Sequence, residues 1–429
     1  MIGIIGGGLT GLTLGNLIDD CEIIEKDSEC GGLCRSIDED GFCFDYAGSH
    51  VIFSKDKEIL EFILKKLGNN VVKRRRNTKI YYKGNYVKYP FENGLSDLNL
   101  RDRFDCVSGL IKSCISRNNH PTNFKEWIYA TFGKGIAEKY LIPYNEKIWK
   151  YDLERIDISW IDGRVPRPPI IDILKSSLGI DTEGYKHQLN FFYPKKGGIN
   201  ALIRSLERDC NSKIINNFEV KSITKENGYW VVSDGEDRRK YDEIIATAPL
   251  FHIVHSMKNT PQYVLDALSD LKYNSLITVM LGMDTEKLSD YSWVYIPDRD
   301  CLPHRVAFPS NYSKFVCPPG KSSVIAEITC KTGDYIYRMS DDELMRRTIE
   351  DLHKKNIINK NDICFSRLKR TEFAYIIYDL NYEKNISIVR NFLEKAGIHL
   401  LGRFAEFKYL NMDACIRNAF NFVKKMRNE

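Results

Sequence analysis

The stretch that most constrains this chain lies at its start, where a glycine-rich turn follows a short apolar segment. Met1 to Ile5 reads as a strand, and the next six residues, GGGLTG, fit the pattern G-x-G-x-x-G. Apolar residues then recur at helical spacing from Leu9 to Ile18, and a second strand-like run, CEIIEKD, follows. Glu25 ends that run about twenty residues after the first glycine. This order of strand, glycines, helix, strand and acid predicts a Rossmann-like unit that binds a dinucleotide.

A second glycine pair indicates which dinucleotide the unit binds. Glu25 is placed to accept hydrogen bonds from a ribose, and ECGGLCRS follows at Glu29 to Ser36. The glycine pair Gly31-Gly32 lies within it and is followed by a short loop and an apolar strand. This arrangement resembles the extended signature of flavoproteins of the amine oxidase and mutase group. The resemblance implies FAD, with NADPH or NADH as a candidate reductant, although no second dinucleotide fingerprint is visible.

Composition excludes several classes of protein. The chain has 429 residues, enough for two or three domains. Its net charge of +5 does not by itself indicate nucleic acid, and we interpret the basic run Lys73 to Arg76 as a solvated strand edge. Twelve cysteines lack metal-site spacing and a disulfide framework, which predicts a reducing compartment and no metal site. With neither a signal peptide nor an apolar run of roughly 20 residues, we expect a cytoplasmic protein without membrane insertion.

The chain alternates between three kinds of segment. We predict an α/β fold in which a Rossmann-like FAD-binding domain is assembled from residues 1–70, 187–250 and 385–429. A helical substrate-binding domain covers 95–186, and an antiparallel sheet domain is formed by 71–94 and 251–384. The nucleotide domain is therefore discontinuous, with two insertions. A homo-oligomer is a candidate assembly of the chain.

Five stretches combine aromatic residues with arginine or asparagine more often than core packing requires. They are VKYPFENGLSDL, YLIPYNEKIWKYDL, SWIDGRVPRPP, YSWVYIPDRDCLPHRVAFPSNYS and LLGRFAEFKYLNMD. With the glycine fingerprint, and in this order over nearly the whole chain, the set resembles the UDP-galactopyranose mutase family, and its eukaryotic-type branch more than the common bacterial one. YPF-x-N, PYN-x-x-(V/I)W and GRF-x-x-x-x-Y are specific when found together.

The resemblance implies a flavin-dependent isomerase that interconverts UDP-galactopyranose and UDP-galactofuranose. In this family N5 of reduced FAD attacks the anomeric carbon, UDP leaves, and a flavin–sugar iminium forms before the ring recloses. Such covalent catalysis splits one rearrangement into easier steps. Two groups of residues match the family's diphosphate site: the arginines Arg164 and Arg305, and the phenols Tyr295, Tyr375 and Tyr409. Guanidinium groups suit phosphate oxygens and stabilise the charge of a departing diphosphate.

The resemblance places the other site residues in three groups. Matches to the uridine pocket and the sugar side are Tyr89, Tyr140, Asn145, Trp149, Trp293, Phe53 and Gln188. The turn that faces the flavin is Gly48, Ser49 and His50, and we expect the His50 backbone carbonyl, more than its imidazole, to meet flavin N5. The remaining matches to FAD are Gly6, Gly8, Leu9, Thr10, Gly11, Glu25, Lys26, Gly31, Gly32, Leu33, Val220, Gly402, Arg403, Asn411 and Met412.

Four departures from the family pattern leave the sugar open. Ser49 replaces a glycine, Glu92 stands where glutamine is expected, Gln188 replaces an asparagine, and Lys55 replaces a histidine. A carboxylate near uracil or diphosphate would repel it. Other UDP sugars, such as UDP-GalNAc, a deoxysugar or UDP-arabinose, therefore stay as alternatives. A flavin amine oxidase or desaturase is the alternative from another class, because it shares the N-terminal signature.

Overall fold

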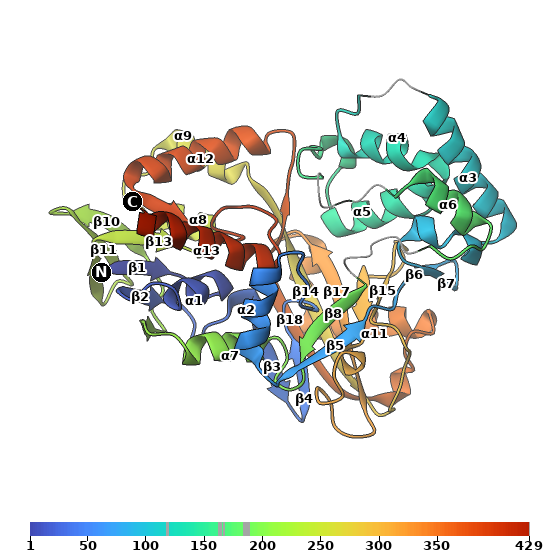
Figure 1. Cartoon of the computed structure of the whole chain (residues 1–429), viewed down its shortest axis with the longest axis horizontal. Helices are drawn as coiled ribbons and strands as arrows, with labels where there is room; N and C mark the ends of the chain where they lie inside the picture. Colours follow the sequence, from blue (N-terminus) through green and yellow to red (C-terminus); the bar gives the residue numbers. More distant parts are fainter. Residues whose placement is uncertain (117–119, 162–164, 166–167, 183–188, 429) are drawn as a thin grey trace.

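The computed structural model describes residues 1–116, 120–161, 165, 168–182 and 189–428. A five-stranded parallel sheet lies near both ends of the chain (Figure 1). Its strands are short, and the three central ones are mostly buried, as expected where helices or other layers cover both faces. Their order is β19 (Ile398–Leu400), β13 (Glu243–Ala246), β1 (Ile2–Ile5), β2 (Cys21–Ile24) and β9 (Lys213–Ile215). The predicted Rossmann-like unit is confirmed, with its strands drawn from distant parts of the chain.

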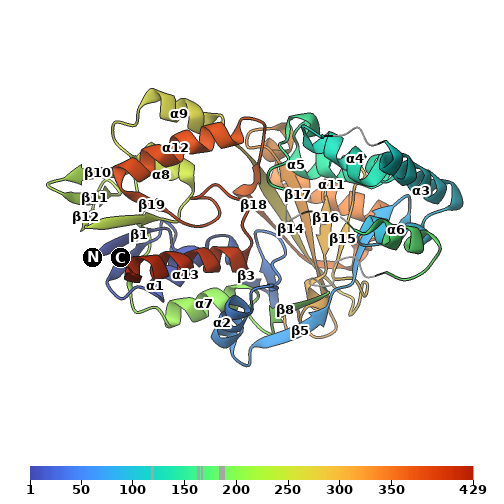
Figure 2. The same cartoon turned by 45° about the horizontal axis from the view of Figure 1, so that its top comes forward.

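Different elements cover the two faces of this sheet. One face packs against α1 (Leu9–Gly15), α2 (Lys57–Leu67), α7 (Asn200–Arg208) and α13 (Met412–Asn428). Figure 2 shows α13 lying along α1. The other face packs against α8 (Leu250–Ser256), α9 (Gln262–Ser269), α12 (Tyr382–Ala396) and the antiparallel sheet β10 (Ser222–Glu226), β11 (Tyr229–Ser233) and β12 (Arg238–Tyr241). The parallel sheet is therefore an inner layer.

A second sheet has seven strands. Their order is β18 (Ile363–Ile377), β14 (Lys272–Met283), β17 (Ser322–Cys330), β16 (Arg305–Ala307), β15 (Trp293–Tyr295), β6 (Thr78–Tyr82) and β7 (Asn85–Lys88). We expected an antiparallel sheet, but β15 and β6 pair in parallel. The reason is that β6 comes from a distant part of the chain, so no hairpin turn fixes its direction relative to β15.

Each face of the seven-stranded sheet has its own cover. Side chains of α11 (Asp341–Lys354) pack on one face, and α10 (Tyr335–Arg338) precedes that helix. The opposite face packs against the hairpin β3 (Ser36–Glu39) and β4 (Phe42–Asp45) and against the ribbon of β5 (Val71–Arg75) and β8 (Asn190–Pro194). Thus β5 pairs with β8 and is not a strand of the larger sheet. Lys73 and Arg75 are exposed on β5, as expected for a solvated strand.

The helical segment lies at the upper right of Figure 1. It contains α3 (Leu100–Ile115), α4 (Phe124–Ile136), a π-helical turn (Ala137–Leu141), α5 (Ile142–Trp149) and α6 (Ile170–Ser177). The side chains of Asn99 and Asn123 accept from backbone N–H groups at the starts of α3 and α4, so both helices have a polar N-cap. Within the described chain, no helix combines the length and apolar character that crossing a bilayer requires.

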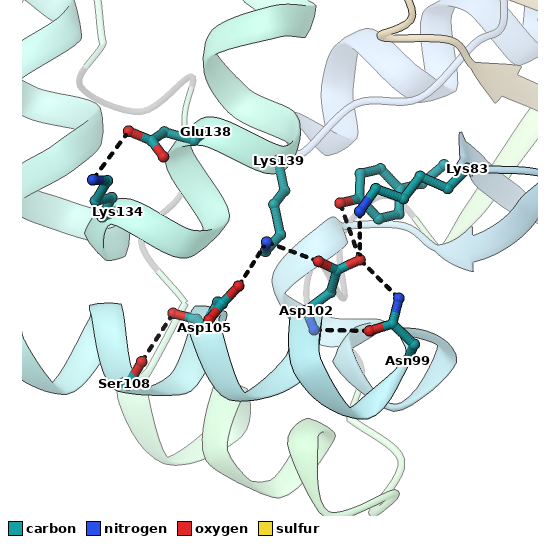
Figure 3. A network of polar contacts seen from close by, with 9 residues as sticks. Lys83, Asn99, Asp102, Asp105, Ser108, Lys134, Glu138 and Lys139 are labelled. Atoms are coloured by element: carbon teal, nitrogen blue, oxygen red, sulfur yellow. Dashed lines mark hydrogen bonds and ion pairs between the residues drawn. The ribbon is translucent and has the colours of Figure 1, made fainter.

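Asp102 on α3 holds this segment together (Figure 3). Its buried carboxylate accepts from Lys139 of the π-helical turn and from Lys83 of the β6–β7 turn, each at 2.9 Å. Asn99 also donates to it at 2.9 Å. Burial alone would raise the pKa of Asp102, but these donors hold that pKa well below its usual range. The carboxylate therefore joins three elements that carry or flank predicted site residues.

Candidate functional site

A cavity of about 1280 Å³ lies where the carboxyl ends of the parallel strands meet the seven-stranded sheet. Residues that follow β1, β2 and β13 line one part, and residues of β15, β16 and β18 line the other. Ligands of open α/β sheets bind at the carboxyl ends of the strands. Because the volume exceeds the roughly 300–1,000 Å³ of a usual small-ligand pocket, the cavity can hold more than one ligand.

Two glycine turns form a wall of this cavity that has no side chains. Gly31 N–H donates to the Gly7 carbonyl at 2.9 Å, and Gly8 pairs with Gly31 as an isolated bridge. A Cβ atom on Gly8 would meet nothing nearer than the Gly32 Cα at 4.0 Å. Gly11 has a different role, because a Cβ there would lie 2.0 Å from the Gly6 oxygen, and so the turn requires glycine for packing. The bare wall fits a pyrophosphate approached by backbone.

Glu25 lies at the end of β2, lines the cavity and is 8% exposed. Its carboxylate accepts from the Gly7 N–H at 2.8 Å and from the Asp27 N–H at 3.0 Å. The acid is thus held rigidly, and each oxygen keeps a lone pair for a ribose hydroxyl. Other predicted cofactor residues that line the same cavity are Gly6, Leu9, Thr10, Lys26, Leu33, Val220, Arg403, Asn411 and Met412. Gly402 lies behind the wall, against Thr10.

Arg305 lies in the other part of the cavity and is held by a buried carboxylate. Its Nε and Nη2 donate to the two oxygens of Glu327 at 2.9 and 2.7 Å. Burial alone would lower the pKa of Arg305, but the Glu327 charge raises that pKa well above its usual value. Among the described residues no hydrogen bond uses Nη1, so one edge of the guanidinium keeps its donors for a ligand.

Four phenol groups line the same cavity as Arg305, and Tyr295 and Tyr375 are the two that lie close enough to interact with its charge. Tyr89, Tyr295, Tyr375 and Tyr409 all line it, with 5.1 Å between the ring centroids of Tyr89 and Tyr295 and 6.1 Å between those of Tyr375 and Tyr409. Burial raises the pKa of both Tyr89 and Tyr375, so these hydroxyls stay protonated near neutral pH and can donate. Trp293 and Phe53 also line the cavity.

The turn from Gly48 to His50 lies between the two parts. Gly48 has φ of +91°, and His50 Nδ1–H donates to its carbonyl at 2.8 Å, which leaves Nε2 as the acceptor nitrogen. Burial lowers the pKa of His50 to about 4, and the Arg305 and Arg403 charges act in the same direction. The imidazole is therefore neutral at pH 7. Asp45 accepts from the His50 backbone N–H at 3.4 Å and so braces the turn.

Three residues expected at the uridine pocket lie behind the cavity wall. Tyr140 and Trp149 are buried, and neither they nor Asn145 line the cavity. Trp149 Nε1 donates to the Asn145 oxygen at 3.0 Å, while the Asn145 amide donates to the Leu141 carbonyl at 2.7 Å. An Asn145–uracil contact would thus have to replace internal bonds. Arg164 and Gln188 lie outside the described residues.

Sequence reasoning missed several residues that shape the site. Glu327 is the main one, and its signal was a single carboxylate in the apolar run SSVIAEITC, since an isolated charge in a buried strand needs a partner. Tyr312 is another: its hydroxyl bonds Ser49 Oγ at 2.8 Å. Arg35 is a third, with its guanidinium 5.2 Å from the Tyr46 ring centroid at the cavity edge. The last two had no distinctive local pattern.

Comparisons with known proteins agree with this geometry. A family model of NAD(P)-binding Rossmann-like domains matches residues 4–67, and one of flavin containing amine oxidoreductases matches residues 174–385. These matches support a flavin cofactor. A crystal structure of reduced UDP-galactopyranose mutase superimposes with a TM-score of 0.91 and 24% identity, covering 100% of this chain and 93% of that one. This chain shares the fold of that mutase.

The same fold occurs in proteins with other activities. A proposed protoporphyrinogen oxidase from Exiguobacterium sp. 255-15 has a TM-score of 0.78 and 17% identity, with 100% of this chain and 98% of that one covered. Putrescine oxidase bound to putrescine has a TM-score of 0.69 and 14% identity, with 100% and 99% covered. The fold is therefore amine-oxidase-like, and the activity has to be argued from the site.

Proposed function

We propose that this chain is a flavin-dependent isomerase that interconverts UDP-galactopyranose and UDP-galactofuranose, with FAD as cofactor and NADPH or NADH as its reductant. One observation carries the proposal. Arg305, with an edge of unused donors, lines the same cavity as four phenols and the two bare glycine turns. A dinucleotide and a second, anionic ligand would therefore lie in one space.

In this proposal each residue has a separate role. Bound and reduced, the flavin supplies a nucleophile for the anomeric carbon of the sugar. Arg305 binds the diphosphate and stabilises the charge that develops as it departs. Tyr295, Tyr375 and Tyr409 complete the diphosphate shell with neutral donors, so they add no net charge. Arg164 acts as the second diphosphate arginine. Tyr89 offers a ring face for the uracil to stack on.

The turn at Gly48 and Ser49 and the neutral imidazole of His50 position the flavin ring. A neutral His50 adds no charge near the diphosphate, and its Nε2 can only accept a hydrogen bond, because Nδ1 carries the proton. Because burial lowers the pKa of His50 to about 4, its imidazole is a weak base at pH 7, and we assign His50 to positioning through the backbone of its turn and give it no proton-shuttle role. The C-terminal loop from Arg403 to Met412 would contact the ribityl and pyrophosphate groups.

Amine oxidation is the second candidate, favoured by the amine oxidoreductase family match. It differs from the proposal in what the site must recognise. An amine substrate does not call for an arginine with unused donors in a cavity lined by phenols, whereas a diphosphate does. It also differs in electron balance, because an oxidase consumes oxygen at every turnover and a mutase consumes no oxidant.

The test incubates dithionite-reduced protein with a panel of UDP sugars, including UDP-galactose and UDP-galactofuranose, and separates the products by chromatography. We expect the ring isomer without net consumption of reductant. We further expect Arg305→Ala to keep its flavin and lose about 100-fold or more in kcat, as when one donor to a developing charge is removed. Arg346→Ala, in an exposed pair with Glu343 on α11, is the matched control. Hydrogen peroxide from an amine, with no isomer from any UDP sugar, would refute the proposal.

A further inference from the structure

Glu327 on β17 is fully buried, with 0% exposure, yet its carboxylate contacts Arg305 and Ser49, which line the two parts of the cavity. Three donors meet its carboxylate: Nε and Nη2 of Arg305, and the backbone N–H of Ser49 at 3.1 Å. Glu327 and Arg305 are directly opposite each other in the β16–β17 pairing, so the ladder register fixes the ion pair. A buried carboxylate in this position costs free energy unless all three donors stay in place.

The ion pair determines which edge of Arg305 faces a ligand. Because Glu327 engages Nε and Nη2, the guanidinium cannot rotate about its long axis without breaking a bidentate contact. The edge that carries Nη1 therefore remains directed at the cavity. Without the carboxylate, the guanidinium would be free to sample other orientations and would lose this arrangement.

The same carboxylate also sets the turn before His50. A Cβ atom on Gly48 would lie 3.0 Å from the Glu327 carboxyl, so the turn approaches the acid as closely as glycine permits. Ser49, where the family pattern has glycine, adds a second tie through its hydroxyl. Tyr312 donates to the Ser292 carbonyl at 3.1 Å, so Ser49 Oγ donates to the Tyr312 oxygen. The turn is thus fastened at two points, to β17 through Glu327 and to the loop between β16 and β17 through Tyr312.

We propose that Glu327 is a positioning residue that holds Arg305 and the Gly48–His50 turn in one arrangement, so that the anion site and the flavin site share a single buried support. The inference rests on the proposed function for the identity of the two ligands. It adds that a change at Glu327 alters both sites at once, whereas a change at Arg305 alone alters the anion site.

The experiment compares flavin-loaded wild type with Glu327→Gln, which keeps the shape and removes the charge. Calorimetry measures Kd for UDP and for inorganic pyrophosphate, and absorbance records the visible flavin band. We expect Glu327→Gln to weaken both ligands by roughly 10- to 100-fold, the worth of a charged hydrogen bond, and to shift the flavin band. Asp284→Asn, an exposed carboxylate just beyond β14 paired with Lys321, is the control and should change neither.

A second pair of variants covers the case in which Glu327→Gln does not fold. Ser49→Gly keeps the backbone N–H that donates to Glu327 and loses the hydroxyl, whereas Ser49→Pro loses both groups. We expect Ser49→Pro to weaken pyrophosphate binding severalfold more than Ser49→Gly does. The inference would be overturned if these two variants bound pyrophosphate equally well. It would also be overturned if Glu327→Gln changed only one of the two readouts, ligand Kd and the flavin band, or changed neither.

The ligands separate this inference from the proposed function. If the wild-type protein binds pyrophosphate but neither UDP nor UDP sugars, the nucleotide-sugar assignment is wrong. The role of Glu327 is then still tested by comparing the Kd for pyrophosphate of wild type and Glu327→Gln. If the wild type binds neither ligand, both proposals are wrong, because Arg305 then does not form an anion site.

Discussion

At the scale of single residues, the site is defined by buried groups whose charge is set by their surroundings. Asp45, beside the turn from Gly48 to His50, is an example. Burial raises its pKa to about 6, although the donors Ile199 N–H, Ser36 and Tyr193 act against the shift. The pKa of His50, whose backbone N–H donates to Asp45, is shifted in the opposite direction, to about 4. The turn thus holds two groups that respond oppositely to pH.

These shifts predict how stability depends on pH. His50 titrates near 6.5 when unfolded and near 4 when folded, so the folded protein binds fewer protons in that window. Its contribution to the free energy of unfolding is therefore present above pH 6.5 and is lost as the pH falls towards 4. We expect the free energy of unfolding, measured with urea, to fall when the pH is lowered from 7 to 4. That fall should be smaller for His50→Gln than for wild type, by on the order of 2 kcal/mol.

Asp45→Asn serves as the opposite control. Because the folded pKa of Asp45 is raised, its ionisation disfavours folding as the pH rises from about 4 to about 6. Removing that group should therefore make the stability of the variant fall more steeply on acidification than that of wild type. Parallel pH profiles for wild type and His50→Gln would show that His50 titrates normally in the folded protein.

At the scale of elements, the helical segment depends on how α3, the π-helical turn and the β6–β7 turn are joined. The π-helical turn carries Tyr140 and leads directly into α5, which carries Asn145 and Trp149. Lys139, inside that turn, is tied to Asp102, so one carboxylate fixes where these aromatic residues lie (Figure 3). Turns of π-helix are frequent at functional sites because they redirect side chains.

We expect Asp102→Asn to lower the free energy of unfolding by about 2–3 kcal/mol, because it leaves Lys139 and Lys83 without their shared buried charge. Asp105→Asn, whose side chain is 45% exposed and also contacts Lys139, should cost less than about 1 kcal/mol. The pKa of Asp102 is lowered, so its stabilisation is present at neutral pH and is lost as the pH falls through the folded pKa. Equal losses in the two variants at pH 7 would contradict the network.

At the scale of the whole molecule, one lysine joins the helical segment to the seven-stranded sheet. Lys147 on α5 is 6% exposed, and its ammonium donates to the carbonyls of Ile296, Asp298 and Pro303 at 2.7 to 2.8 Å. Those carbonyls belong to the loop between β15 and β16, which follows Tyr295 and precedes Arg305. The placement of the site aromatic residues relative to the arginine therefore depends on this contact.

We expect Lys147→Met to cost about 3 kcal/mol or more in the free energy of unfolding, since three buried carbonyls lose their donor. Lys150→Met, at the end of the same helix, is the matched control. Among the described residues no hydrogen bond is seen for the Lys150 ammonium, so its loss should cost less than about 1 kcal/mol. The measurement is urea unfolding, and similar losses in both variants would argue against the three-carbonyl contact.

The local sequence was enough to predict the nucleotide-binding unit. The residues from Met1 to Glu25 form it from contiguous strand, turn, helix and strand, so spacing and glycine content alone identify it. The predicted residues Arg305, Tyr295, Tyr375 and Tyr409 come from matched motifs, and the structure brings them to one cavity. Their roles remain predictions.

Only the tertiary structure decided which groups support that site. Glu327 meets Ser49, which lies 278 residues away in the chain, and Lys147 meets a loop about 150 residues later. No local pattern encodes such contacts, because they arise from strand register and from the packing of distant segments. The parallel pairing of β15 with β6, and the burial of Tyr140 and Trp149 behind the cavity wall, were decided in the same way. The turn from Gly48 to His50 is thus positioned by Glu327 and Tyr312, which come from distant segments of the chain.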